Sequence, residues 1–166
     1  MEMNYPILLL AALVPLVVGF VWYNPKVFGT IWMNENKFSE ADMKGANMAK
    51  IFFLTYLCSF FIAFIVQFLV IHQMHVFSAV MNEPGVNDPS SSIGMWLADF
   101  MKKYGHNFRT FKHGALHGFL SGLFLVLPII AINGLFERKS GKYIMIHGFY
   151  WVVCLMLMGG IICQLA

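Results

Sequence analysis

The chain has 166 residues, of which 59% are apolar and 11% are charged, with a formal net charge of +3. Soluble domains carry about 25% charged residues, so this composition excludes a protein whose whole surface faces water and favours one that faces lipid. The basic residues are scattered rather than striped with aromatic residues, which argues against nucleic-acid binding.

Four long runs contain no Asp, Glu, Lys or Arg: residues 7–23, 51–71, 114–136 and 143–165. About 20 apolar residues cross a hydrocarbon core of about 30 Å, and none of these runs alternates as barrel strands do. We therefore expect residues 1–166 to form a single domain, an all-α membrane protein with a bundle of four transmembrane helices.

The basic residues predict how these helices are oriented. Loops 24–50 and 137–142 together carry seven Lys and Arg residues, whereas segment 72–113 carries four. The positive-inside rule then places the two loops in the cytoplasm and both termini outside. We expect the protein to reside in the cell (inner) membrane.

The first run has a face of small residues, Ala11, Pro15 and Gly19, four positions apart. Small residues at this spacing let a second helix approach closely. No Lys or Arg precedes the run, and the sequence WYNP follows it in place of a small-residue cleavage site. We therefore expect a helix of the mature protein rather than a signal peptide.

Four histidines flank the outer ends of the second and third runs: His72 and His75 follow one, and His113 and His117 begin the other. Imidazoles suit copper and zinc, and facing histidines could ligate haem. Histidines at a lipid boundary can also simply bond to water, headgroups and backbone. Because no charged ligand accompanies them, we expect no metal and no cofactor, with a metal or haem site as the alternative.

The outer segment 72–113 contains a stretch with helical spacing of apolar residues, which predicts an amphipathic helix over about residues 91–104. Serines precede the stretch and can cap it. Such a helix would lie in the extracellular or periplasmic interface of the membrane, or cover the bundle from outside.

The third run carries glycines at every fourth position, Gly114, Gly118 and Gly122. Gly-x-x-x-Gly spacing allows helix backbones to come into contact. We interpret these glycines as packing positions, either within the bundle or toward a protein partner or a second copy, and expect Gly118→Leu to disrupt the packing.

A polar cluster is predicted at the inner face, from Tyr23, Asn24, Asn133, Glu137, His147 and Tyr150. The short loop 137–142 makes the third and fourth helices antiparallel neighbours, so Glu137 and His147 should meet. Polar groups at membrane depth are costly unless partnered. We expect these residues to satisfy one another, with an acid–base pair as the alternative.

The segments WYNPKVFGTIW (22–32), NGLFERK (133–139) and IHGFY (146–150) resemble the small four-helix membrane family known as domain of unknown function 1761. The most specific part comprises Trp22, Tyr23, Pro25, Phe28, Gly29 and Trp32. The resemblance covers nearly the whole chain, although the outer segment 76–110 is longer than the family pattern suggests. It implies a multi-pass membrane protein and no assigned reaction.

Three classes of function remain: an accessory or scaffolding subunit, a small transporter or metal- or haem-handling protein that uses the outer histidines, and a membrane enzyme. No run carries the charge at mid-membrane that ion-coupled transport usually needs. The sequence contains no HExxH or GxSxG motif, and only His147 with Glu137 offers an acid and a base. The sequence therefore favours an accessory or scaffolding subunit of a membrane complex over an enzyme, with a small transporter or metal- or haem-handling protein as the alternative.

Overall fold

The computed structural model describes residues 3–39, 41–42 and 45–166, and within these ranges it contains helices and no strand. Four helices are long and apolar enough to cross a membrane: Tyr5–Trp22, Met48–Val70, Phe111–Phe136 and Gly141–Leu165. Each lies within three residues of a predicted run, so the four predicted helices are confirmed. Their length and composition indicate a multi-pass membrane protein, while its orientation stays a prediction.

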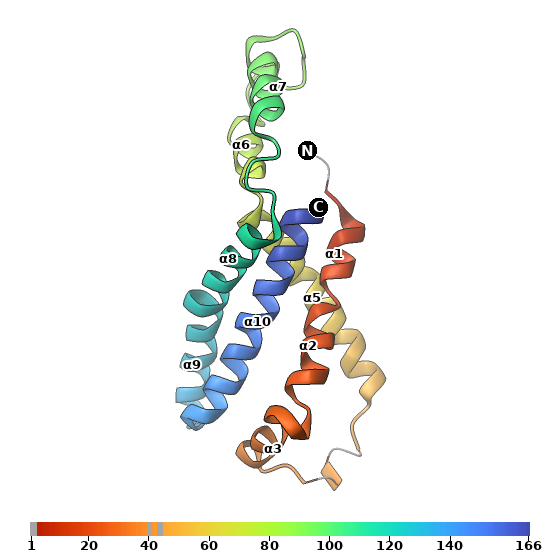
Figure 1. The fold of residues 1–166 in the computed structure, drawn as a ribbon, viewed down its shortest axis with the longest axis vertical. Helices are drawn as coiled ribbons and strands as arrows, with labels where there is room; N and C mark the ends of the chain where they lie inside the picture. The colour runs from red at the N-terminus through yellow and green to blue at the C-terminus, as the bar shows by residue number, and fades with distance from the viewer. Residues whose placement is uncertain (1–2, 40, 43–44) are drawn as a thin grey trace.

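Helix α10 (Gly141–Leu165) lies at the centre of the bundle, between α8 and α9 on one side and α1 and α2 on the other (Figure 1). It is the most buried of the four spans, with Cys154, Met158 and Cys163 fully covered. The side chain of Ser140 caps its start by accepting a hydrogen bond from the Tyr143 backbone N–H. The other helices are therefore arranged around α10.

The first span is divided into α1 (Tyr5–Ala11) and α2 (Val14–Trp22), with Pro15 at the beginning of α2. Proline lacks the N–H that would continue the helical hydrogen bonds, so the break falls just before it. Ala11 and Pro15 are buried, and the Pro15 carbonyl accepts a 2.8 Å hydrogen bond from the Tyr150 hydroxyl. A π-helical turn, η1 (Pro25–Gly29), and helix α3 (Thr30–Asn36) follow.

The third span comprises α8 (Phe111–Ser121), a π-helical turn η2 (Gly122–Val126) and α9 (Leu127–Phe136). Its glycines lie against α10. A Cβ atom added to Gly114 would lie 2.1 Å from the Gly159 carbonyl oxygen, and one added to Gly118 would lie 2.0 Å from the Leu155 carbonyl oxygen. At Gly122 it would come within 2.6 Å of the Val152 Cα. Only glycine permits this separation of α8 and α10, so the glycine face is filled within the chain.

The second span, α5 (Met48–Val70), is separated from α6 (His72–Val80) by Ile71, whose backbone is extended. Helix α7 (Ser92–Tyr104) occupies the predicted amphipathic stretch. Together α6 and α7 extend beyond the end of the bundle where both termini lie, rather than covering the spans (Figure 1). A position of α7 at the membrane interface stays a prediction.

Two contacts close the loop formed by the outer segment. The buried Gln73 amide donates 2.9 Å hydrogen bonds to the carbonyl oxygens of Tyr104 and Asn107. The Arg109 guanidinium donates a 2.9 Å bond to the Cys163 carbonyl near the end of α10. The chain consequently returns to the bundle beside the point at which it left.

Candidate metal centre

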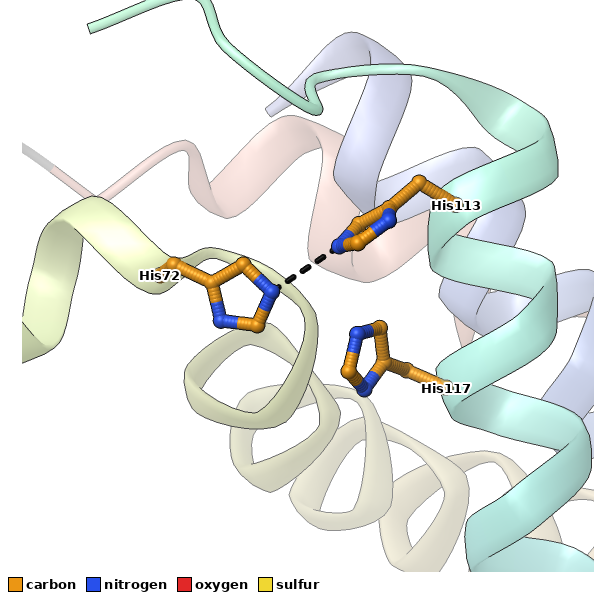
Figure 2. A group of neighbouring side chains, drawn as sticks. All are labelled: His72, His113 and His117. Atoms are coloured by element: carbon orange, nitrogen blue, oxygen red, sulfur yellow. Dashed lines mark hydrogen bonds between the residues drawn. The ribbon is translucent and has the colours of Figure 1, made fainter. Parts of the chain in front are cut away.

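Three imidazole rings converge where the outer segment leaves and re-enters the bundle. His72 begins α6, and His113 and His117 lie on α8; we call these residues the histidine triad. One ring nitrogen of each lies within 4.8 Å of the others, and the Nε2 atoms of His72 and His113 are 2.9 Å apart. Figure 2 shows the three rings pointing toward one another from the two helices.

Local structure explains this convergence. The extended backbone of Ile71 ends α5, so His72 starts a new helix at the edge of the bundle. Thr110 caps α8 by accepting a 3.3 Å hydrogen bond from the His113 N–H. His113 and His117 are one turn apart and share a face of α8, with ring centroids 4.6 Å apart.

The environment of the triad favours uncharged imidazole. A hydrogen bond between two ring nitrogens requires one to accept, so His72 and His113 cannot both be protonated on the atoms that meet. Burial, followed by the neighbouring His113 and His75, lowers the pKa of His72 below its usual value. Neutral imidazole is the form that binds a metal ion.

The spacing of the nitrogens is close to that of a metal site. A zinc–nitrogen bond of about 2.0–2.1 Å in a tetrahedral site places two ligand nitrogens about 3.4 Å apart. The triad's 2.9 Å contact and its 4.8 Å limit bracket this value, so small side-chain rotations would bring three nitrogens around one ion. Haem fits poorly, because its porphyrin would have to lie between two axial ligands, whereas His72 Nε2 and His113 Nε2 are in direct contact at 2.9 Å.

His75, which the sequence grouped with the other histidines, lies outside the triad. It is exposed on α6, and His72 contacts His113 and His117 instead. The expectation of no metal rested on the absence of charged ligands. The structure adds the convergence of three rings, which favours the metal alternative.

A second group of polar residues lies at the opposite end of the bundle. The Tyr23 hydroxyl and His147 Nδ1 form a 3.0 Å hydrogen bond, and Tyr150 packs against Tyr23 with ring centroids 5.3 Å apart. Asn24 does not join them, because its side chain accepts a 2.9 Å hydrogen bond from the Lys26 backbone N–H. The predicted cluster is therefore smaller than the sequence indicates.

Glu137 and His147 line one cavity of about 230 Å³ between α9 and α10, together with Asn133. No hydrogen bond joins Glu137 to His147 among the described residues. Glu137 is the residue at which α9 ends, and its side chain is exposed. The two residues thus share a cavity, while the imidazole has Tyr23 as its hydrogen-bond partner.

Aromatic side chains of α2 and α3 also contribute to this end of the bundle. The Trp22 indole donates a 3.2 Å hydrogen bond to the Ile146 carbonyl, and Trp32 packs edge-on against Tyr23. At Gly29 a Cβ atom would lie 2.2 Å from the Tyr23 carbonyl oxygen. In the sequence, these residues belong to the Trp-Tyr-x-Pro…Phe-Gly…Trp pattern, which indicates the turn after α2.

A family model described as a protein of unknown function (DUF1761) matches residues 7–163, nearly the whole chain. The chain belongs to the DUF1761 family. The matched range contains both the triad and the Tyr23–His147 pair of this DUF1761 protein, and the family description assigns no activity to either. No curated protein and no solved structure matches the chain.

The two ends of this DUF1761 protein therefore differ in chemistry. Among the described residues, the triad presents three imidazole nitrogens without a carboxylate or a thiolate, at the boundary of the spans. Such a set leaves a coordination position open on a tetrahedral ion. The opposite end presents a hydrogen-bonded Tyr–His pair beside a cavity that contains a carboxylate.

Proposed function

We propose that this DUF1761 protein handles metal ions in the membrane and binds one late first-row transition metal ion per chain at the histidine triad. The observation that carries the proposal is the convergence of three imidazole nitrogens, from two helices, within 4.8 Å of one another. Imidazole ligands favour zinc and copper over magnesium and calcium, which prefer oxygen.

A purely structural role explains the triad less well. A histidine that stabilises a fold gains most from a hydrogen-bond partner of the complementary kind, such as a carbonyl group or a carboxylate. Within the described part of the chain, the only hydrogen bond made by the three rings is the one between His72 and His113. Three similar groups directed at one point form a set that a cation would satisfy.

The surroundings hold the triad in place, as a metal site requires. Gln73 follows His72 directly, is only 4% exposed and binds two carbonyl groups of the returning segment. On the other side, Gly114 and Gly118 hold α8 in backbone contact with α10. Both elements that carry the ligands are therefore anchored to the protein rather than suspended in loops.

Metal analysis of the purified full-length protein tests the proposal. Chelator-treated protein would be dialysed against zinc or copper and its bound metal measured, and Co²⁺ would report the coordination geometry through its visible spectrum. We expect one ion per chain. His113→Gln should weaken zinc binding by at least about 100-fold, because loss of a direct ligand exceeds the 10–100-fold effect of losing an outer-shell contact.

His75→Gln is the matched control, since His75 lies three residues from His72 on the same helix and outside the triad. It should retain the affinity of the wild type. Absence of a stoichiometric ion, or equal losses in His75→Gln and His72→Gln, would contradict the proposal. The glycine face of α8 lies against α10 and is therefore not free for a partner. Docking of a partner through another small-residue face stays a prediction.

A further inference from the structure

The cavity between α9 and α10 lies at the end of the bundle opposite the triad, and it has a polar and an apolar part. Glu137 lies where α9 ends, Asn133 and His147 lie about one turn deeper, and Ile130 and Trp151 lie farthest from the connecting loop. At 1.5 Å per residue, the distance from Glu137 to Ile130 along the helix is about 10 Å. The cavity thus changes from a carboxylate at its outer end to apolar side chains within the span.

The polar groups of the cavity have unused hydrogen-bonding capacity. The Glu137 carboxylate makes no ion pair or hydrogen bond within the described part of the chain, where the only salt bridge joins Lys103 to Asp99. His147 uses Nδ1 for Tyr23, and its buried Nε2 has no partner there. When the Tyr23 hydroxyl donates to Nδ1, the ring proton resides on Nε2, which can then donate.

These groups are arranged in the order in which a phospholipid presents its parts. A carboxylate at the outer end suits an ammonium group, and amide and imidazole donors one turn deeper suit a phosphate oxygen. Beyond them, Ile130 and Trp151 offer an apolar surface. Ile129 and Phe136, four and three residues from Asn133 on the same side of α9, are 50% and 89% exposed, so the helix surface beside the cavity is open to lipid.

We infer that this cavity binds the headgroup of a phospholipid that carries a primary amine. The ammonium contacts Glu137, the phosphate contacts Asn133 and His147, and an acyl chain follows Ile130 and Trp151. A volume of about 230 Å³ accommodates a headgroup and leaves the chains on the outer surface of the helices. A primary ammonium has three N–H donors for the carboxylate, whereas the trimethylated ammonium of a choline lipid has none.

Native mass spectrometry of the full-length protein in detergent tests this inference. The protein would be titrated with phosphatidylethanolamine, and separately with phosphatidylcholine of the same acyl chains. We expect the ethanolamine lipid to bind at a concentration about tenfold lower, a difference of about 1.4 kcal/mol, because only its ammonium donates hydrogen bonds to the carboxylate. Free O-phosphoethanolamine shares the headgroup but lacks the chains, and it should compete only at far higher concentration.

Glu137→Gln keeps the shape of an exposed side chain and removes its charge, so it should fold normally and bind the two lipids within about twofold of each other. Glu83→Gln, at an exposed position in the outer segment, is the matched control and should keep the preference. Equal binding of both lipids by the wild type, or a preference that survives Glu137→Gln, would overturn the inference. Competition by free O-phosphoethanolamine at the concentration of the lipid would overturn a lipid as the source.

Discussion

The close contact between α8 and α10 makes a single methyl group at Gly118 a severe perturbation. The Cβ atom of Gly118→Ala would lie 2.0 Å from the Leu155 carbonyl oxygen and 2.9 Å from the Met156 Cα. An ordinary carbon–oxygen contact is about 3.4 Å, so the helices must separate by about 1.4 Å. Both obstacles are backbone atoms of α10, which cannot rotate away as a side chain can.

Overpacking of a tightly packed interior costs about 1–3 kcal/mol, and a displacement that affects the whole α8–α10 contact belongs at the upper end. At about 2–4 °C per kcal/mol for a chain of this size, Gly118→Ala should lower the melting temperature in detergent by about 6–12 °C. Gly118→Leu should prevent assembly of the bundle. Size-exclusion chromatography after heating would measure both effects.

Gly19→Ala provides the control, because Gly19 also lies in a spanning helix but its Cβ atom would meet the Tyr150 hydroxyl at an ordinary 3.5 Å. It should melt within about 2 °C of the wild type, since a change without a clash is usually within about 0.5 kcal/mol. If Gly118→Ala and Gly19→Ala melted at the same temperature, the backbone contact would not limit the packing of α8. The account of the glycine face would then be refuted.

Two further predictions concern titration and the polar cluster. Because burial, His113 and His75 lower the folded-state pKa of His72 below its ordinary value of about 6.5, this residue stabilises the metal-free protein fully above pH 6.5. That contribution is lost as the pH falls below 6.5 and the unfolded chain takes up the proton first. As the pH is lowered below 6.5, the melting temperature of the wild type should therefore decrease, and that of His72→Gln should decrease less. His147→Ala removes the hydrogen bond to Tyr23 and should lower the free energy of unfolding by about 2 kcal/mol. Glu137→Ala changes an exposed side chain and should alter it by no more than about 0.5 kcal/mol. Equal losses of the two variants in chemical denaturation would instead indicate a direct contact between Glu137 and His147.

The four spanning helices could be read from the sequence because the restriction that lipid imposes is local. A backbone in hydrocarbon must satisfy its own hydrogen bonds, so an uncharged run of sufficient length specifies a helix without reference to the rest of the chain. The same holds for helix α7, whose apolar spacing and preceding serines suffice to predict it. The period-four glycines on α8 indicate a close contact in the same way, although they do not name the helix that is contacted.

What only the tertiary structure decided is which distant side chains meet. The sequence placed His72, His75, His113 and His117 together at the outer boundary, and it could not tell which of their rings converge. Whether His72 reaches α8 depends on the break at Ile71 and on the return of the outer segment, which Gln73 and Arg109 fix through contacts far apart in the chain. Likewise, both Glu137 and Tyr23 were expected near His147, and the actual partner follows from the packing of α2 against α10, where Trp22 and Tyr150 also form hydrogen bonds between the two helices. Composition and periodicity constrain neighbours within a few residues, whereas a site formed from several helices depends on contacts that no local pattern records.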